Sequence, residues 1–129
     1  PGQPSFADFR TTYPVRSVTP DTKVFGLFGD PVAHSFSPIL HNHMLRRLKV
    51  DAIYLPFRVP KGLLPEAVKA FETVPVSGYS VTIPHKEAAA ALAQEAEPDV
   101  TTAGAANTLV RQPDGSFFAA NTDYSAALT

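Results

Sequence analysis

The sequence contains no cysteine, no tryptophan and no long hydrophobic run among its 129 residues. Without cysteine the chain forms no disulfide and no thiolate metal site, which suits a reducing compartment such as the cytoplasm. A membrane-spanning helix needs roughly 18 consecutive apolar residues, and the first residues lack the charged segment of a signal peptide. We therefore expect a cytoplasmic protein without a membrane partner.

An excess of one charge is also lacking, because 11 Lys and Arg residues stand against 12 Asp and Glu residues for a net charge of -1. Nucleic-acid binding requires a basic patch, so we expect no nucleic-acid partner. Hydrophobic residues make up 44% of the chain, and a chain of this size buries roughly two thirds of its unfolded surface. The composition predicts one folded domain.

Strand-like and helix-like segments alternate along the chain. Their predicted order is strand 23–28, helix 38–48, strand 52–59, helix 64–71, strand 79–83 and helix 84–93. Such alternation is typical of a parallel sheet with helices on its faces. Because Pro56 cannot donate a ladder hydrogen bond, we expect the second strand at or near a sheet edge.

The last third of the chain predicts an antiparallel hairpin. Segments 105–110 and 116–121 flank a Pro-Asp-Gly turn, and such a turn joins antiparallel strands. If the turn is centred on Asp114, Asn107 faces Asn121 at the open end of the hairpin. The whole pattern predicts an α/β fold, a three-layer sandwich with a mainly parallel sheet, helices on both faces and a C-terminal β-hairpin.

Polar side chains follow the first predicted strand. Ser35 and Ser37 precede Pro38 at the start of a predicted helix. Two hydroxyls beside the positive end of a helix dipole predict a binding site for an anion such as a carboxylate. The alternative is that Ser37 is only an N-cap and Ser35 only a loop hydroxyl.

A second polar group follows the third predicted strand. Lys86 lies in the first turn of a predicted helix. The helix dipole destabilises a cation there by about 0.3–1 kcal/mol. Beside the hydroxyls of Ser80 and Thr82, it could act as a general acid or as a hydrogen-bond donor to a ligand. The alternative is an exposed lysine beside Glu87. His85 is expected to be a half-exposed residue at the helix start.

The third polar group is Asn107 together with Asn121, Thr122 and Asp123. Asp123 either caps a helix that begins at Tyr124 or pairs with Lys86. A nearby carboxylate would favour the charged ammonium of a lysine, whereas burial would favour the neutral amine. The spacing alone leaves both roles open.

Four motifs can be read together, namely GDPVAHSFSP at 29–38, VTIPHK at 81–86, GAANT at 104–108 and NTD at 121–123. In this order they strongly resemble the substrate-binding domain of the shikimate dehydrogenase family. The resemblance covers about residues 23–129. The H-S-x-S-P and T-x-P-x-K segments together make it specific.

The resemblance implies a role for each polar group. Ser35 and Ser37 would bind the carboxylate of shikimate. Ser80 stands where many members have Asn, which changes one contact to a ring hydroxyl and resembles the bifunctional plant-type branch. The remaining contacts to the ring hydroxyls would come from Thr82, Lys86, Asn107 and Asp123.

The implied reaction is the reversible, NADPH-dependent reduction of 3-dehydroshikimate. The cofactor would supply the hydride and Lys86 the proton, with Lys86 and Asp123 as the catalytic pair. Two alternatives stay open, a quinate dehydrogenase that uses NAD and a non-catalytic module that binds a hydroxy-carboxylate.

The expectations for a nucleotide cofactor and for a metal rest on motifs that this sequence lacks. In the family a Rossmann domain with a glycine-rich loop comes next, and a C-terminal helix returns to the substrate site. This sequence contains no G-x-G-x-x-G, so NADP is expected in the full-length parent but not bound to this chain alone. His41 and His43 lie two apart on one predicted helix and cannot face one ion, so we expect no metal site.

Residues 1–22 hold four of the 13 prolines and predict a linker or the tail of an upstream domain. The segment PGQPSFADFR at 1–10 resembles the closing loop and last helix of a type I 3-dehydroquinate dehydratase, in which Gln3 would cover the substrate. This resemblance implies a dehydratase fused before a shikimate-binding domain at 23–129. The alternative is an ordinary linker.

Overall fold

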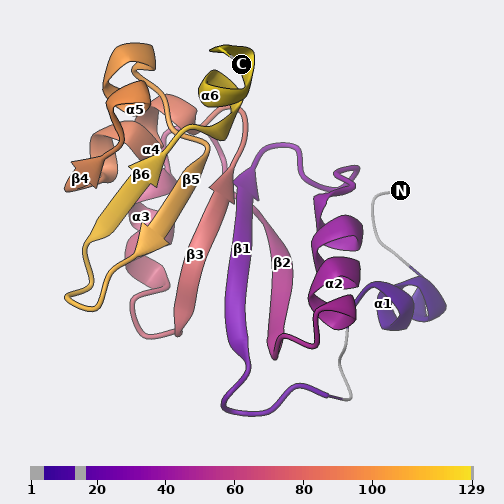
Figure 1. Cartoon of the computed structure of the whole chain (residues 1–129). Helices are drawn as coiled ribbons and strands as arrows, with labels where there is room; N and C mark the ends of the chain where they lie inside the picture. The colour runs from indigo at the N-terminus through magenta and orange to yellow at the C-terminus, as the bar shows by residue number, and fades with distance from the viewer. Residues whose placement is uncertain (1–4, 14–16, 129) are drawn as a thin grey trace.

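The computed structural model describes residues 5–13 and 17–128. Gln3 lies outside these residues. The helices are α1 (Phe6–Thr12), α2 (Ser37–Arg47), α3 (Leu64–Ala70), α4 (Lys86–Leu92), α5 (Pro98–Ala103) and α6 (Thr122–Leu128). The strands are β1 (Lys23–Gly29), β2 (Ala52–Arg58), β3 (Val76–Val81), β4 (Glu95–Ala96), β5 (Thr108–Arg111) and β6 (Phe117–Ala120). They form one six-stranded sheet in the described part of the chain (Figure 1).

The sheet is mainly parallel, as the sequence predicts. Its strand order is β2-β1-β3-β5-β6-β4. Strand β1 pairs in parallel with β2 and β3, and β4 pairs in parallel with β6. Strand β5 is antiparallel to both of its neighbours. All described strands except β5 therefore run in the same direction.

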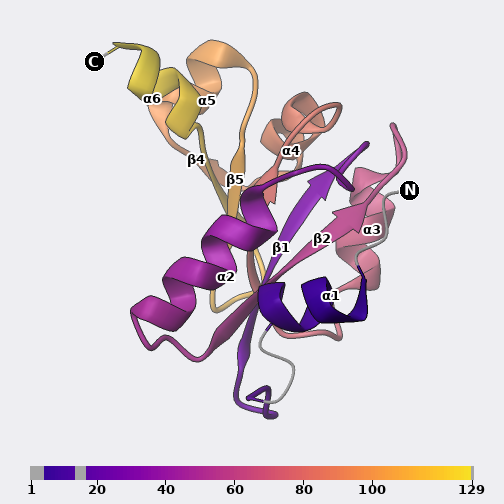
Figure 2. The same ribbon diagram turned by 90° about the vertical axis from the view of Figure 1, so that its right-hand side faces the viewer.

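Helices cover both faces of the sheet, which confirms the predicted sandwich. Helix α2, with α1 beside it, lies on one face, and α3 and α4 lie on the other (Figure 2). Helix α5 packs beside β6 and α6 at the far end of the sheet. No helix in the described ranges is long and apolar enough to cross a membrane.

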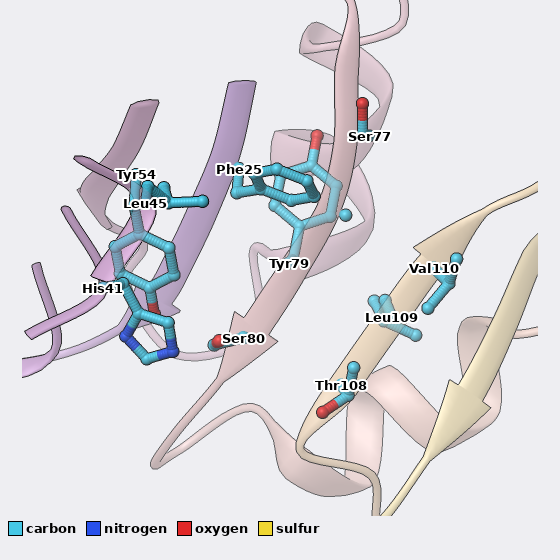
Figure 3. A pocket seen from close by; sticks show the side chains of 11 residues that line it. Phe25, His41, Leu45, Tyr54, Ser77, Tyr79, Ser80, Thr108, Leu109 and Val110 are labelled. Carbon is cyan, nitrogen blue, oxygen red and sulfur yellow. The ribbon is translucent and has the colours of Figure 1, made fainter. Parts of the chain in front are cut away.

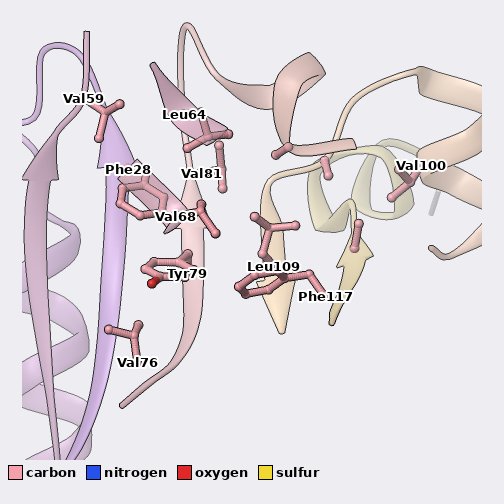
Figure 4. Packing of buried hydrophobic residues seen from close by; sticks show 13 residues of the cluster. Phe28, Val59, Leu64, Val68, Val76, Tyr79, Val81, Val100, Leu109 and Phe117 are labelled. Carbon is pink, nitrogen blue, oxygen red and sulfur yellow. The ribbon is translucent and has the colours of Figure 1, made fainter. Parts of the chain in front are cut away.

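The main hydrophobic core lies between the sheet and the layer of α3 and α4 (Figure 4). Phe28 and Tyr79 stack with ring centroids 4.3 Å apart. Leu64 from α3 and Ala89 from α4 are fully buried against the same cluster. Full burial of side chains of this kind stabilises the fold by about 1.5–3 kcal/mol for each large residue, so this layer fixes the strands whose ends carry the polar motifs.

On the opposite face a single amide joins α2 to the edge strand β2. The Asn42 side chain accepts a hydrogen bond from the Tyr54 N–H at 2.9 Å and donates to the Tyr54 carbonyl at 2.8 Å. It also donates to the Pro38 carbonyl at 2.8 Å. Because an edge strand leaves backbone groups unpaired, the buried Asn42 amide gives partners to the Tyr54 N–H and carbonyl. Strand β2 lies at the edge, as Pro56 predicts.

Several predicted boundaries are wrong. The first hairpin strand begins at Thr108 and not at residue 105, and the last helix begins at Thr122 and not at Tyr124. Strand β3 begins at Val76, three residues before the predicted start, because Val76 already pairs with Val24 of β1. Helix α4 begins at Lys86 and not at Pro84. Pro84 lies in a turn that the His85 N–H closes by donating to the Thr82 carbonyl at 3.0 Å.

His85 is also not half-exposed. It is 1% exposed, and its Nε2 hydrogen-bonds the Val59 carbonyl at the end of β2. A buried imidazole with a backbone partner has its polar group satisfied. His85 therefore has a structural role at the start of α4, where it joins this helix to the chain beyond β2.

Two short elements, β4 and α5, are absent from the sequence prediction. Strand β4 has two residues and pairs with β6, and α5 follows at once. Residues 1–22 were predicted as a linker or tail, and residues 6–12 of that stretch form α1. Helix α1 lies against α2, where Arg46 donates to the Thr11 carbonyl at 2.7 Å.

Candidate functional site

The ends of several strands meet at one edge of the sheet. Strands β1, β3 and β6 end there, and the antiparallel β5 begins there (Figure 1). The Val81 N–H donates to the Asn107 carbonyl at 2.8 Å, and the Thr82 N–H donates to the Phe28 carbonyl at 2.9 Å. These bonds bring together motifs that are far apart in the sequence. Ligands of open α/β sheets bind at such an edge.

An ion pair lies at the centre of this edge. The Lys86 ammonium donates to the Asp123 carboxylate at 2.7 Å, with side chains that are 33% and 67% exposed. The hydrogen bond from Lys86 lowers the pKa of Asp123, and the hydrogen bond from Asn107 acts in the same direction. Asp123 is therefore an anion at neutral pH. The structure brings this predicted pair into direct contact.

The position of Lys86 is fixed through its backbone as well. Lys86 is the first residue of α4, and its carbonyl accepts a hydrogen bond from the Ala106 N–H at 2.8 Å. This bond ties the start of α4 to the segment that enters β5. The backbone of Lys86 is therefore held by both α4 and the segment before β5. Its ammonium lies in the first turn of the helix, where the helix dipole disfavours a cation.

The open end of the hairpin is a network of amides. Asn107 donates to the Thr122 hydroxyl at 2.8 Å and accepts from the Thr122 N–H at 3.1 Å. Asn121 accepts from the Tyr124 N–H at 2.9 Å and so satisfies a free backbone donor at the start of α6. The predicted capping role of Asp123 is thus wrong, because Asn121 takes it. The carboxylate of Asp123 is left to pair with Lys86.

Ser35 and Ser37 lie at the start of α2. The Ser35 hydroxyl accepts a hydrogen bond from the Ser37 N–H at 3.2 Å. Ser37 is the first residue of α2. The residue in the N-cap position is Phe36, whose side chain makes no capping hydrogen bond. Ser37 is therefore not the N-cap, and its hydroxyl is not used to close the helix start. Both serines are half-buried.

Ser80 and Thr82 lie on the neighbouring strand end. Thr82 is half-buried and lies against Gly29. A Cβ atom added at Gly29 would collide with the methyl group of Thr82. Ser80 and Thr108 line an open groove of about 300 Å³ between α2 and the hairpin (Figure 3). The groove is otherwise mostly apolar, and the Lys86–Asp123 pair does not line it.

One residue of this region is missing from the sequence prediction. Tyr54 is 3% exposed and lines the same groove. In the sequence it is one of several apolar or aromatic residues of a predicted strand, and no pattern separates it from a core residue. Its position beside α2 arises only when β2 and β3 are both placed next to β1.

The described residues offer little to a metal or a dinucleotide. No three His, Asp or Glu side chains among them converge. The segments that join β1 to α2 and β3 to α4 contain no glycine between residues 30 and 36 or between 82 and 85. A pyrophosphate needs the close backbone approach that glycine permits. These two loops therefore do not form a glycine-rich phosphate loop.

Comparison with known proteins points to one family. A family model described as "Shikimate dehydrogenase substrate binding domain" matches residues 27–109. A bifunctional 3-dehydroquinate dehydratase/shikimate dehydrogenase from Arabidopsis thaliana is 40% identical over 124 residues, which are 95% of this chain and 20% of that protein. A shikimate dehydrogenase (NADP(+)) from a Nostoc species is 42% identical over 106 residues, 82% of this chain and 36% of that protein.

Solved structures share the fold. The shikimate dehydrogenase of Aquifex aeolicus superposes with a TM-score of 0.80 at 32% identity, covering 86% of this chain and 41% of that one. The shikimate 5-dehydrogenase of Listeria monocytogenes, solved with shikimate and NAD, gives 0.79 at 31% identity, covering 86% and 38%. The chain thus spans well under half of these relatives.

Proposed function

Because the chain belongs to the shikimate dehydrogenase family and matches its substrate-binding domain, we propose that it binds shikimate and 3-dehydroshikimate. In this proposal it forms the substrate-binding half of an NADP-dependent shikimate dehydrogenase, an enzyme of aromatic amino-acid biosynthesis. The observation that carries the proposal is the contact between Lys86 and Asp123 at 2.7 Å, at the sheet edge where the other polar motifs meet.

The carboxylate of the ligand would bind at the start of α2. Ser35 and Ser37 offer hydroxyls there, and the first backbone N–H groups of an 11-residue helix add their partial positive charge. Neither serine belongs to a loop that contains glycine, so a carboxylate suits the place better than a pyrophosphate. This end would fix the orientation of the ring.

The ring hydroxyls would lie along the strand ends. Asn107 and Asp123 are joined through a shared network with Thr122 and Lys86, so their oxygens and amide already have set directions. Hydroxyl groups both donate and accept hydrogen bonds, which suits a mixed set of donors and acceptors. The remaining contacts would come from the neighbouring hydroxyls of Ser80 and Thr82.

Lys86 would transfer the proton of the reaction. Its ammonium lies against the Asp123 carboxylate at 2.7 Å, which holds it beside the strand ends. It would donate a proton to the oxygen of the ketone as this becomes an alcohol, and it would take the proton back in the reverse direction. The proposal assigns this chain substrate binding and proton transfer only.

The test is an assay of the natural protein that contains this chain in full length. Shikimate should be oxidised with NADP⁺, and the change in nicotinamide absorbance reports the rate. Quinate with NAD⁺ is the comparison. A rate with quinate and NAD⁺ that exceeds the shikimate rate would favour the quinate alternative, and no turnover with either would leave only a binding module.

A dehydratase domain before residue 23 is a second part of the proposal. The relative from Arabidopsis thaliana that carries both activities in its name aligns with 124 residues, whereas the relative from Nostoc aligns with 106. The longer alignment includes chain outside the shikimate-binding domain. An assay of the full-length natural protein for dehydration of 3-dehydroquinate tests this. Lack of that activity would favour a linker.

The remaining partners and the compartment are also proposed. We infer that the protein works in the cytoplasm with a small-molecule substrate and without nucleic acid or membrane. Its lack of cysteine and its net charge of -1 support this. Fractionation of cells that express the full-length protein, together with a DNA-binding assay at low salt, would test both statements.

A further inference from the structure

The side-chain amide of Asn107 has partners on both of its polar atoms. Its Oδ1 accepts hydrogen bonds from the Thr108 hydroxyl at 2.9 Å and from the Thr122 N–H at 3.1 Å. An amide oxygen has two lone pairs, so both are taken. Its Nδ2 donates to the Thr122 hydroxyl at 2.8 Å. A ligand can therefore meet only the N–H side of this amide.

The second N–H of Asn107 is directed at the Asp123 carboxylate. The hydrogen bond from Lys86 lowers the pKa of Asp123 most, and a hydrogen bond from Asn107 lowers it further. The amide thus has donors on its oxygen side and acceptors on its nitrogen side. This places its N–H groups beside the ion pair at the centre of the candidate site.

The neighbours of Asn107 decide between the two orientations of its amide, which differ by half a turn and are told apart by their hydrogen-bond partners. In the turned orientation the Asn107 Nδ2 would face the Thr122 N–H, which can only donate, and Oδ1 would face the Asp123 carboxylate, which can only accept. Both contacts would be repulsive. The Thr108 hydroxyl adds a second donor to Oδ1 in the observed orientation.

Thr108 is itself held firmly in the sheet. It is the first residue of β5, where it pairs with Ser80 of β3 and with Ala120 of β6. Its side chain is half-buried and lines the same groove as Ser80 (Figure 3). Groups carried by strands are placed more accurately than groups carried by loops. The Thr108 hydroxyl is therefore a fixed donor beside the Asn107 amide.

We propose that Thr108 is a positioning residue of the substrate site, whose hydroxyl holds the Asn107 amide with its N–H groups toward the ligand. Without that hydroxyl one lone pair of Oδ1 loses its donor, and Thr122 alone holds the amide. A partly satisfied polar network is less rigid than a complete one. The ligand oxygen that accepts from Asn107 then meets a less fixed donor. This inference rests on the proposed binding of shikimate.

The test replaces Thr108 in the full-length natural protein. Thr108→Val keeps the branched shape that suits a strand and removes the hydroxyl. We expect KM for shikimate to rise about three- to tenfold, the worth of one hydrogen bond, with kcat nearly unchanged. Thr108→Ser keeps the hydroxyl and should restore KM to near the wild-type value.

Thr22→Val is the matched control. Thr22 is a buried threonine whose hydroxyl donates to the Asp51 carboxylate at 2.7 Å, and it lies just before β1, at the end of this strand that is far from the site. Its replacement should leave KM unchanged. Unfolding temperatures of all variants accompany the rates, so that a loss of folded protein is not mistaken for a loss of affinity.

A double substitution separates positioning from direct contact. If Thr108 acts through Asn107, Thr108→Val should have no further effect on shikimate affinity, measured by calorimetry, in an Asn107→Ala background. A loss of affinity that persists in this background would show that Thr108 contacts the ligand itself. That result would overturn the inference.

The free protein gives a second readout, which needs no ligand. In Thr108→Val the Asn107 N–H should donate less well to Asp123, so the pKa of Asp123 should rise, by less than removal of Lys86 would cause. NMR of the full-length protein with isotope-labelled aspartate carboxyl groups follows this titration. An unchanged midpoint would contradict the positioning role, because the amide would then be held without Thr108.

Two failures are distinguishable. If the wild-type protein binds shikimate and Thr108→Val binds it equally well, this inference is wrong and the proposed function stands. If the wild-type protein binds no shikimate, the proposed function is wrong, and the inference falls with it.

Discussion

Lys86 and Asp123 are 37 residues apart in the sequence, and their side chains meet at 2.7 Å at the edge of the sheet. Lys86 begins the helix after β3, and Asp123 lies in the first turn of the helix after β6. Between these strands runs β5, the one described strand of opposite direction. The pair therefore exists because the hairpin places β6 parallel to β3, with both strand ends on the same side.

Lys86→Met in the full-length protein should abolish most turnover and leave the fold intact. Loss of a general acid lowers kcat by about 10²–10⁴-fold. The ion pair is largely exposed, so its loss should change the free energy of unfolding by less than about 1 kcal/mol. Steady-state rates and thermal unfolding measure both. Lys69→Met, on the exposed side of α3, is the control, and turnover near the wild-type rate in Lys86→Met would end the catalytic assignment.

The carboxylate of Asp123 should titrate below the ordinary aspartate pKa of about 3.9, because Lys86 lowers its pKa. The ion pair contributes its full stabilisation above the ordinary value and loses it as the pH falls through the lowered one. Carbon-detected NMR across acidic pH follows the group. In Lys86→Met the midpoint of Asp123 should rise.

Asp114 offers an internal control for that titration. Hydrogen bonds from Ser116 lower its pKa in the hairpin turn, and Lys86 is not among the causes. Its midpoint should stay low in Lys86→Met. A midpoint of Asp123 that does not move in this variant would show that the contact with Lys86 is not populated in solution.

Asn42→Ala should destabilise the chain by about 2–4 kcal/mol, because it leaves the N–H and the carbonyl of Tyr54 buried without their side-chain partner. Chemical denaturation with urea measures the change. His43→Ala, one residue further on the exposed side of α2, should stay within about 0.5 kcal/mol of the wild type. Equal effects of the two substitutions would mean that the amide does not hold β2 to the helix.

Gly29→Ala should weaken shikimate binding. A Cβ atom at Gly29 would meet the Thr82 methyl group and lie 3.0 Å from Val32, so Thr82 must move. Gly26→Ala is the matched control, since its Cβ would lie 2.8 Å from Phe57 and from Tyr79 in the core. Both variants should lose stability, and only Gly29→Ala should lose affinity per folded molecule. Equal affinities, measured by calorimetry, would remove Thr82 from the site.

Local patterns predict much of this fold because each has a direct physical cause. The Pro-Asp-Gly turn fixes the hairpin register, so Thr108 faces Ala120 and Leu109 faces Ala119, as a turn centred on Asp114 requires. Pro56 in turn predicts the edge position of β2. The hairpin depends on residues close in sequence. The edge position of β2 depends on the backbone N–H that Pro56 lacks.

Other features depend on contacts that sequence spacing does not reveal. Strand β4 has only two residues, too few for any periodicity. His85 is buried where its ring bonds the Val59 carbonyl just after β2. Asn121 rather than Asp123 caps α6, because the helix begins at Thr122 and Asn121 directly precedes it. For His85 a tertiary partner decides the role of the side chain, and for Asn121 the start of a helix does. Tyr54 is like His85, since only the order of β2, β1 and β3 brings it to the groove beside α2.

The central claim is that the polar strand ends form one binding site for shikimate, and an amide chemical-shift titration of the 129-residue chain tests it most directly. Shikimate is the ligand, with quinate and a simple cyclohexane carboxylate as comparisons. The account predicts shifts that cluster at Ser35, Ser37, Ser80, Thr82, Lys86, Asn107 and Asp123. Shifts that are absent or scattered over the chain at millimolar shikimate would contradict it.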